Sequence, residues 1–129
     1  MKNLEITATK NSPQINFSAS TGILSITGES YLEDVTPFYE PVLNWLNEYL
    51  EDLDEEDVAI FNMDVANFNS SSSEAFVNIF DMLEDCAQAD IDVTINWFFD
   101  EDDELSQERG EEFAEDLEDV TFVFVKKTK

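Results

Sequence analysis

Four consecutive serines, Ser70–Ser73, are the residues of this chain whose type and spacing most directly offer chemistry. They follow the apolar segment "VAIFNMDVANF" (58–68) and open "SEAFVNIFDMLEDCAQA" (73–89), where apolar residues recur at helical spacing. A serine hydroxyl can accept a phosphoryl group, which adds about −1.5 to −2 charge and three strong hydrogen-bond acceptors. The run therefore indicates either a flexible spacer or a place where phosphate is attached and removed.

A strand-to-helix turn is the predicted setting of these serines, with Asn69–Ser72 forming the turn. Ser71 and Glu74 are three residues apart, which is the spacing of a capping box, and Ser72 lies between them. If Ser71 caps the helix, Ser70 sits just outside it with its hydroxyl facing solvent. A helix start also stabilises an added anion through its free amides and dipole. Serine-rich helix starts are common without any regulatory role, so this pattern alone leaves both interpretations open.

The first third of the chain has the alternation of short strands. Gly22 and Gly28 bound the last of them, as is typical of turns and strand ends. The period then changes to three and four, which predicts an amphipathic helix in which Thr36 is the cap and Pro37 takes the first helical position. Antiparallel pairing of the strands follows from their short connections. The expected elements are strands over 4–9, 14–19 and 22–28 and a helix over 36–53.

From residue 58 onward strands and helices alternate. Right-handed crossovers make such strands parallel neighbours with helices packed on the sheet. The fold class predicted is α/β (α+β): one domain over residues 1–129 with a mixed sheet, antiparallel at its N-terminal part, and about three helices. The expected elements of this part are strands over 58–68, 91–99 and 120–125 and helices over 73–89 and 103–118.

Charge and composition limit the kinds of partner. The chain has 129 residues, 43% of them hydrophobic with 11 Phe, which excludes a disordered acidic tail. Six Lys and Arg against 31 Asp and Glu give a formal net charge of −25. Such a field repels nucleic acid and anionic membranes. It is typical of a solvated surface, of adaptation to a salty cytoplasm, or of a protein that binds basic proteins.

An enzyme is not expected. The chain has no His and one Cys, so Cys86 has no base to activate it and no partner for a disulfide; a buried, inert thiol is predicted. The same inventory provides no catalytic triad, zinc site or phosphate-binding loop, and no cofactor is implied. The N-terminus lacks the apolar core of a signal peptide and no apolar run is long enough to span a bilayer. We therefore expect a non-enzymatic, cytoplasmic protein.

Acidic residues 100–111 invite a calcium-site interpretation. Asp100, Asp102, Glu104 and Glu111 occupy positions 1, 3, 5 and 12 of a twelve-residue loop. Position 6 is Leu105, however, where an EF-hand loop requires Gly for its sharp turn. We expect a solvated helix start here and no metal site.

Two segments, 22–50 and 68–87, carry a resemblance to a known family. The first contains a Gly-x-Ser-Tyr turn followed by a Phe-x-x-Pro-Val-Leu-x-Trp-Leu helix, and the second an Asn-Ser-Ser-Ser turn that opens a helix ending in Leu-Glu. Together with the flanking strands, these motifs resemble the SiaC-type family of bacterial regulatory phosphoproteins over nearly the whole chain. The matching residues are Gly28, Ser30, Tyr31, Phe38, Pro41, Val42, Leu43, Trp45, Leu46, Asn69, Ser70, Ser71, Ser72, Leu83 and Glu84.

The resemblance implies a fold similar to the STAS domain of anti-sigma-factor antagonists. It implies that a dedicated protein kinase phosphorylates the residue after Asn69, which is Ser70, and that a PP2C-type phosphatase removes the phosphate. It further implies partner switching, in which one phosphorylation state binds an effector such as a diguanylate cyclase that controls biofilm behaviour. Ser70 stands where the family often has Thr, which keeps the hydroxyl, and Glu74 stands where it often has Lys. Ser71 remains a rival phosphoacceptor.

A different class of function is an acidic mimic of nucleic acid, or a general interaction module without phosphoregulation. The net charge favours it, whereas it leaves the serine turn without a role. Binding of a mimic to a basic nucleic-acid-binding protein should weaken steeply with salt, whereas a phospho-switch should follow the state of one serine. Of the two, the serine turn favours a partner-switching phosphoprotein.

Overall fold

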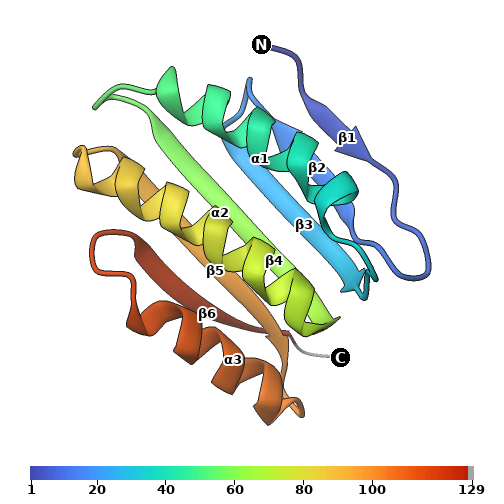
Figure 1. The fold of residues 1–129 in the computed structure, drawn as a ribbon. Coiled ribbons are helices and arrows are strands. Elements are labelled where there is room, and N and C mark those ends of the chain that lie inside the picture. The colour runs from blue at the N-terminus through green and yellow to red at the C-terminus, as the bar shows by residue number, and fades with distance from the viewer. Residues whose placement is uncertain (128–129) are drawn as a thin grey trace.

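One mixed sheet with three helices forms the described chain (Figure 1). The computed structural model describes residues 1–127; residues 128 and 129, the end of the predicted domain, lie outside the described residues. The elements are β1 (Leu4–Ile6), β2 (Gln14–Ser18), β3 (Ile23–Ser30), α1 (Thr36–Glu51), β4 (Val58–Phe68), α2 (Ser70–Gln88), β5 (Asp92–Asp100), α3 (Glu104–Glu115) and β6 (Thr121–Lys127).

The six strands lie in the sheet in the order in which they occur along the chain. β1, β2 and β3 pair antiparallel, whereas β3, β4, β5 and β6 pair parallel. The three helices are the connections between the parallel strands, and all of them cover the same face of the sheet (Figure 1). The predicted α/β class, the antiparallel N-terminal part and the parallel C-terminal part are confirmed.

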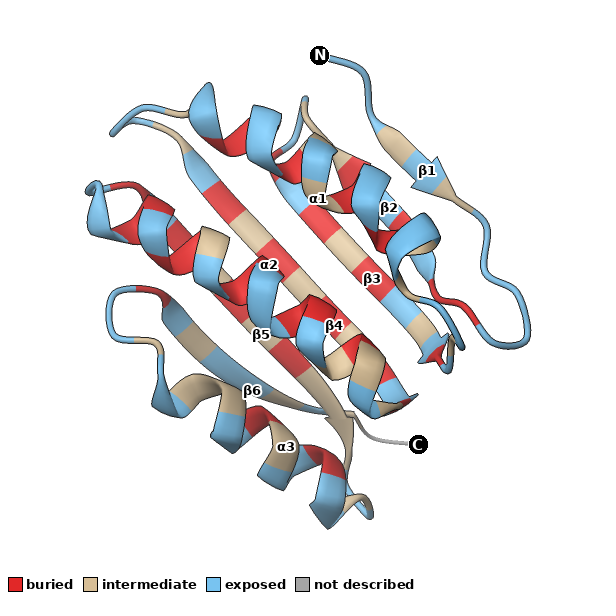
Figure 2. Cartoon of the chain, viewed as in Figure 1, coloured by how far each residue is buried: buried red, intermediate tan, exposed pale blue. Residues whose placement is uncertain are grey.

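The core lies between the sheet and the helices (Figure 2). Alternation correctly predicted the inward faces of β4 and β5, and the apolar stripe of α2 is buried as expected. In α1 the buried stripe is turned slightly from the predicted one: Tyr39 and Leu46 are buried, whereas Phe38 and Trp45 are half-buried. Trp45 reaches toward the N-terminus instead, where its indole donates to the carbonyl of Lys2 at 2.8 Å.

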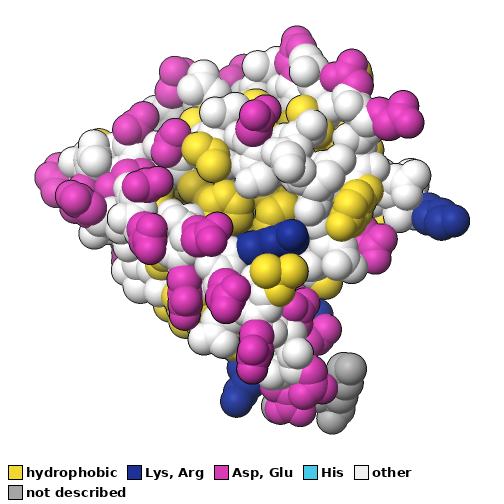
Figure 3. Space-filling model, turned by 60° about the horizontal axis from the view of Figure 1, so that its bottom comes forward, with side chains coloured by type: hydrophobic (Ala, Val, Ile, Leu, Met, Phe, Trp, Pro, Cys, Tyr) yellow, Lys and Arg dark blue, Asp and Glu magenta, His cyan; other side chains and the backbone are white. Residues whose placement is uncertain are grey.

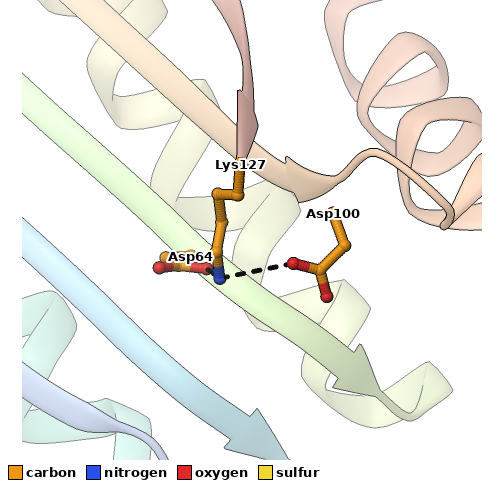
Figure 4. A network of polar contacts seen from close by, with 3 residues as sticks. All are labelled: Asp64, Asp100 and Lys127. Atoms are coloured by element: carbon orange, nitrogen blue, oxygen red, sulfur yellow. Dashed lines mark hydrogen bonds and ion pairs between the residues drawn. The ribbon is translucent and has the colours of Figure 1, made fainter. Parts of the chain in front are cut away.

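No helix of residues 1–127 covers the opposite face of the sheet, which carries both polar and apolar side chains. Because side chains alternate along a strand, Asp64 points away from the helices, between the inward-facing Met63 and Val65. Lys127 at the end of β6 donates to Asp64 at 2.9 Å and lies 3.9 Å from Asp100 (Figure 4). This lysine ties β6 to β4 across β5.

Several predicted boundaries were wrong. The strand predicted over 4–9 ends at Ile6, and the helix predicted over 103–118 ends at Glu115.

Two residues predicted at the ends of elements also have other roles. Gly28 does not end its strand: β3 continues to Ser30, and the pairing register with β4 shifts between Gly28 and Glu29, where Gly28 has φ 123°. A glycine accommodates such a bulge because it has no Cβ. Thr36 is also not the cap of α1 but its first residue, so Pro37 takes the second helical position and not the first. The Thr36 amide donates to the side-chain oxygen of Asp34 at 3.2 Å.

Candidate functional site

Ser70 is the first residue of α2, and only Asn69 separates it from the end of the central strand β4. Its side chain is exposed. The carboxyl ends of the parallel strands meet at this end of the sheet, which is where α/β proteins commonly place their binding sites. Ser70 thus lies where a strand passes into a helix, as predicted, but it is the first helical residue and not a turn residue just outside the helix.

Asn69 fixes the conformation of this turn. Its backbone is extended, with φ −92° and ψ 176°, and its side-chain oxygen accepts the amide of Ser72 at 3.0 Å. Its side-chain nitrogen Nδ2 donates to the carbonyl of Leu32 at 2.9 Å, in the loop after β3. Asn69 therefore caps α2 and holds it to the neighbouring loop.

The predicted capping box of Ser71 and Glu74 does not form. A cap residue needs non-helical backbone, and Ser71 already lies within the helix, one residue after its start. Asn69 offers the same side-chain bond to an amide three residues on, so the helix starts at Ser70 instead of near Ser73. Glu74 is exposed on the first turns of α2.

Ser72 is sealed inside the protein. It is 0% exposed, and its hydroxyl donates to the carbonyl of Ser30 at 2.8 Å and accepts from the Ser30 hydroxyl at 2.7 Å. The Ser30 hydroxyl in turn lies 2.7 Å from that of Tyr39. Burial raises the pKa of Tyr39 to about 12 despite the hydrogen bond with Ser30, so the phenol stays neutral. These hydroxyls join β3, α1 and α2, and leave Ser72 no room to be modified.

The structure therefore separates the four serines of the run. Ser70 is exposed, Ser71 and Ser73 are half-buried, and Ser72 is buried. The spacing alone gave no means to distinguish them. The signal that could have found the buried one is the Gly-x-Ser-Tyr turn, whose serine is Ser30, the partner of Ser72.

A cavity of about 250 Å³ opens beside Ser70, between the start of α2 and helix α3. Figure 3 brings this end of the molecule forward: a basic side chain lies among hydrophobic ones near its middle, and acidic side chains occupy much of the remaining surface. The guanidinium carbon of Arg109 lies 4.7 Å from the centre of the Phe68 ring. The cavity is lined by Phe68, Asn69, Ser70, Ser73, Arg109, Glu112 and Phe113.

Helix α3 is held close to the sheet and so positions Arg109. The Asp103 side chain caps α3 by accepting the amide of Ser106 at 3.0 Å, and the indole of Trp97 donates to the Ser106 carbonyl at 3.0 Å. At Gly110 the helix approaches Trp97 so closely that an added Cβ would lie 2.8 Å from the ring. Sequence reasoning missed Arg109, although it is the one arginine of the chain.

A second hollow, of about 340 Å³, lies between α1 and α2. Tyr39 and Leu43 contribute to it from α1, and Glu74 and Asn78 from α2. It lies on the helix-covered side of the molecule and shares helix α2 with the serine turn.

The remaining sequence-based expectations concern metal and thiol chemistry. Among residues 1–127, no group of three or more Cys, Asp or Glu is arranged to hold a metal ion. Asp100 faces Lys127 and Asp103 caps α3, so the acidic segment there begins a helix, as expected. Cys86 is buried, and burial raises the pKa of its thiol. Within residues 1–127, none of the three helices combines the length and the hydropathy that a membrane span requires.

The fold and the site define a mixed α/β domain that presents an exposed hydroxyl where β4 passes into α2. The model of the SiaC family regulatory phosphoproteins matches residues 6–127, and the chain belongs to this family. The resemblance found in the sequence is confirmed.

Individual relatives agree over nearly the full length. The chain is 31% identical over 116 residues to the Pseudomonas aeruginosa (strain UCBPP-PA14) protein named Uncharacterized protein PA14_02130, covering 90% of both chains. The structure of the present chain is similar to SiaC of Pseudomonas aeruginosa, with a TM-score of 0.90 and 28% identity. The match covers 98% of this chain and 100% of the other. The present chain is equally similar, with a TM-score of 0.90 and 29% identity over 96% and 99%, to a chain in the crystal structure of the diguanylate cyclase SiaD in complex with its activator SiaC from the same organism.

Proposed function

We propose that this chain acts as one non-enzymatic, cytoplasmic regulatory domain whose partners change when Ser70 is phosphorylated. The observation that carries this proposal is the contrast within the serine run. Ser70 is exposed at the capped start of α2, whereas Ser72 is sealed by Ser30. A protein kinase can reach the first hydroxyl and not the second. Ser71 is the rival acceptor, since it is half-buried.

The proposed effector is a diguanylate cyclase. This rests on the similarity to a chain of a complex in which SiaC is the activator of the cyclase SiaD. The serine turn and the hollow between α1 and α2 form the proposed docking surface, since both include residues of α2. Phosphate on Ser70 would bring charge into a contact that must lose water, so the phosphorylated chain should release the effector. A PP2C-type phosphatase would restore binding.

Mapping of the phosphorylated residue tests the proposal. The full chain is incubated with ATP and the protein kinase encoded beside its gene, and its intact mass and peptides are analysed. We expect one phosphate, on Ser70. Ser70→Ala should abolish the modification, and Ser71→Ala, the matched control one residue on, should leave it unchanged.

The opposite results overturn the proposal. Phosphate outside Ser70–Ser73, or no phosphate at all, contradicts a regulatory role of the turn. Phosphate that persists in Ser70→Ala and disappears in Ser71→Ala transfers the role to Ser71.

A further inference from the structure

We propose that Arg109 binds the phosphate carried by Ser70, so that the modified residue is held inside the chain's own cavity between α2 and α3. This inference rests on the proposed function and specifies what the phosphorylated state looks like. In this state the phosphoserine side chain joins the start of α2 to the middle of α3, whereas the unmodified Ser70 hydroxyl makes no hydrogen bond to Arg109.

The placement of the two residues is the first support. Ser70 and Arg109 come from different helices and line the same cavity of about 250 Å³. Phosphorylation adds one phosphorus and three oxygens to the hydroxyl, and this cavity is the space beside it. Phe113 and Phe68 form the apolar part of the lining, so a charge pair there is shielded from part of the solvent.

The state of the guanidinium is the second support. Within residues 1–127, Arg109 takes part in no ion pair, although the chain has 31 carboxylate side chains. Lys127 is the contrasting cation, since it is already paired with Asp64 and Asp100 (Figure 4). Arg109 is instead supported by the Phe68 ring, with its guanidinium carbon 4.7 Å from the ring centre. Stacking of this kind uses the face of the guanidinium and leaves its N–H edge for an anion.

The chemistry of the two groups fits. Guanidinium presents planar, paired donors that match two phosphate oxygens, and such charge-assisted bonds are among the strongest in proteins. Glu112 lines the same cavity and is the competing anion. A phosphate with about −1.5 to −2 charge attracts Arg109 more strongly than a single carboxylate does. In a chain of net charge −25, Arg109 is also the cation that offsets the repulsion a new anion meets at this position.

A phosphorus NMR titration of the phosphate tests the proposal without any kinase. Phosphoserine is placed at residue 70 during translation, and the pKa of the phosphate near 6 is followed at low salt. We expect this pKa to be about one pH unit lower in the otherwise unchanged chain than in the Arg109→Gln variant, because a nearby cation favours the dianion. Arg109→Lys should lie between them, and Lys126→Gln, a control at an exposed cation, should match the unchanged chain. Equal titration of the unchanged chain and Arg109→Gln overturns the proposal.

A second measurement needs no substitution. Because the chain has one arginine, its side-chain Nε–H gives a single resonance. Phosphorylation at Ser70 should shift this resonance and slow its exchange with water at least severalfold. An unchanged resonance contradicts the proposal even if Arg109→Gln fails to fold. Failure of the kinase to modify Ser70 would defeat the proposed function instead, and neither of these two measurements depends on that kinase.

Discussion

The two ends of helix α2 differ in how completely their polar groups are paired. Near the C-terminal end, the buried carboxylate of Glu84 accepts the amides of Glu118, Asp119 and Val120, at distances of 2.9 to 3.2 Å. At the N-terminal end, the Ser70 hydroxyl is exposed and Arg109 beside it has no ion-pair partner among the described residues. The Glu84 carboxylate therefore fixes the loop before β6 through its hydrogen bonds. At the other end, Arg109 is available to pair with an added anion.

We propose a division between two residues of this helix: Glu84 serves the stability of the fold, whereas Ser70 near the opposite end carries the regulation. A saturated carboxylate cannot gain a partner without losing another, so the Glu84 end is suited to holding the fold. An exposed hydroxyl next to an unpaired cation can change state without unfolding its surroundings. The predictions below test this division, in order of decreasing expected effect.

Replacement of Glu84 should have the largest effect. In Glu84→Gln an NH₂ group faces amides that need acceptors, and hydrogen bonds to charged groups are among the stronger ones in folded proteins. We expect a loss of about 2–4 kcal/mol in the free energy of unfolding, measured by chemical denaturation. Asp85→Asn, the exposed neighbour, should change it by less than about 0.5 kcal/mol. Equal effects of the two variants would refute the division.

Acid should weaken the hydrogen bonds between Glu84 and the amides before β6. The loss of stability should be smaller than in Glu84→Gln, because a protonated carboxyl still accepts some hydrogen bonds. Burial alone would raise the pKa of Glu84, but the amide hydrogen bonds outweigh it and lower the pKa below its usual 4.5. The contribution of Glu84 to stability is therefore present above its unfolded pKa and is lost as the pH falls through the folded value. The stability difference between the unchanged chain and Glu84→Gln should shrink below about pH 4.5. A constant difference down to pH 2 would contradict this assignment.

Ser72→Ala should destabilise the chain by about 1–3 kcal/mol, since it removes two buried hydrogen bonds, one to the carbonyl and one from the hydroxyl of Ser30. Thermal unfolding monitored by circular dichroism measures this effect. The matched control is Ser70→Ala, two residues earlier.

The smallest expected effect is that of Ser70→Ala itself. Its hydroxyl is exposed and makes no side-chain hydrogen bond among residues 1–127, so stability should change by less than about 0.5 kcal/mol while phosphorylation is lost. If instead Ser70→Ala destabilises as much as Ser72→Ala, the two serines do not differ as proposed.

The sequence predicted those features that depend on local periodicity. The inward faces of β4 and β5 and the apolar stripe of α2 follow directly from alternation and helical spacing. The change from strand to helix was placed correctly between Phe68 and Phe76, because these residues belong to patterns of different period, but the serines predicted in a turn lie within the helix. The cap of α2 was predicted wrongly. Asn69 and Ser71 both satisfy the three-residue spacing of a cap, and only the backbone conformation decides between them.

Features that join distant segments could not be predicted in this way. Glu84 meets its amide partners more than 30 residues later in the chain, and Ser72 meets Ser30 at a separation of 42 residues. Arg109 lies beside Ser70 because α3 packs closely on Trp97 at Gly110, a contact without any local signature. The sheet order brings these groups together, and the order becomes visible only in the folded chain.

Binding of a diguanylate cyclase by the chain in its two states is the most direct test of the central claim. Affinity is measured by calorimetry for the unmodified chain and for the chain carrying phosphoserine at residue 70, at one salt concentration. We predict binding by the unmodified chain and at least about tenfold weaker binding by the phosphorylated one, since a desolvated charge costs more than about 1.4 kcal/mol. Equal affinity of the two forms would contradict a switch at Ser70.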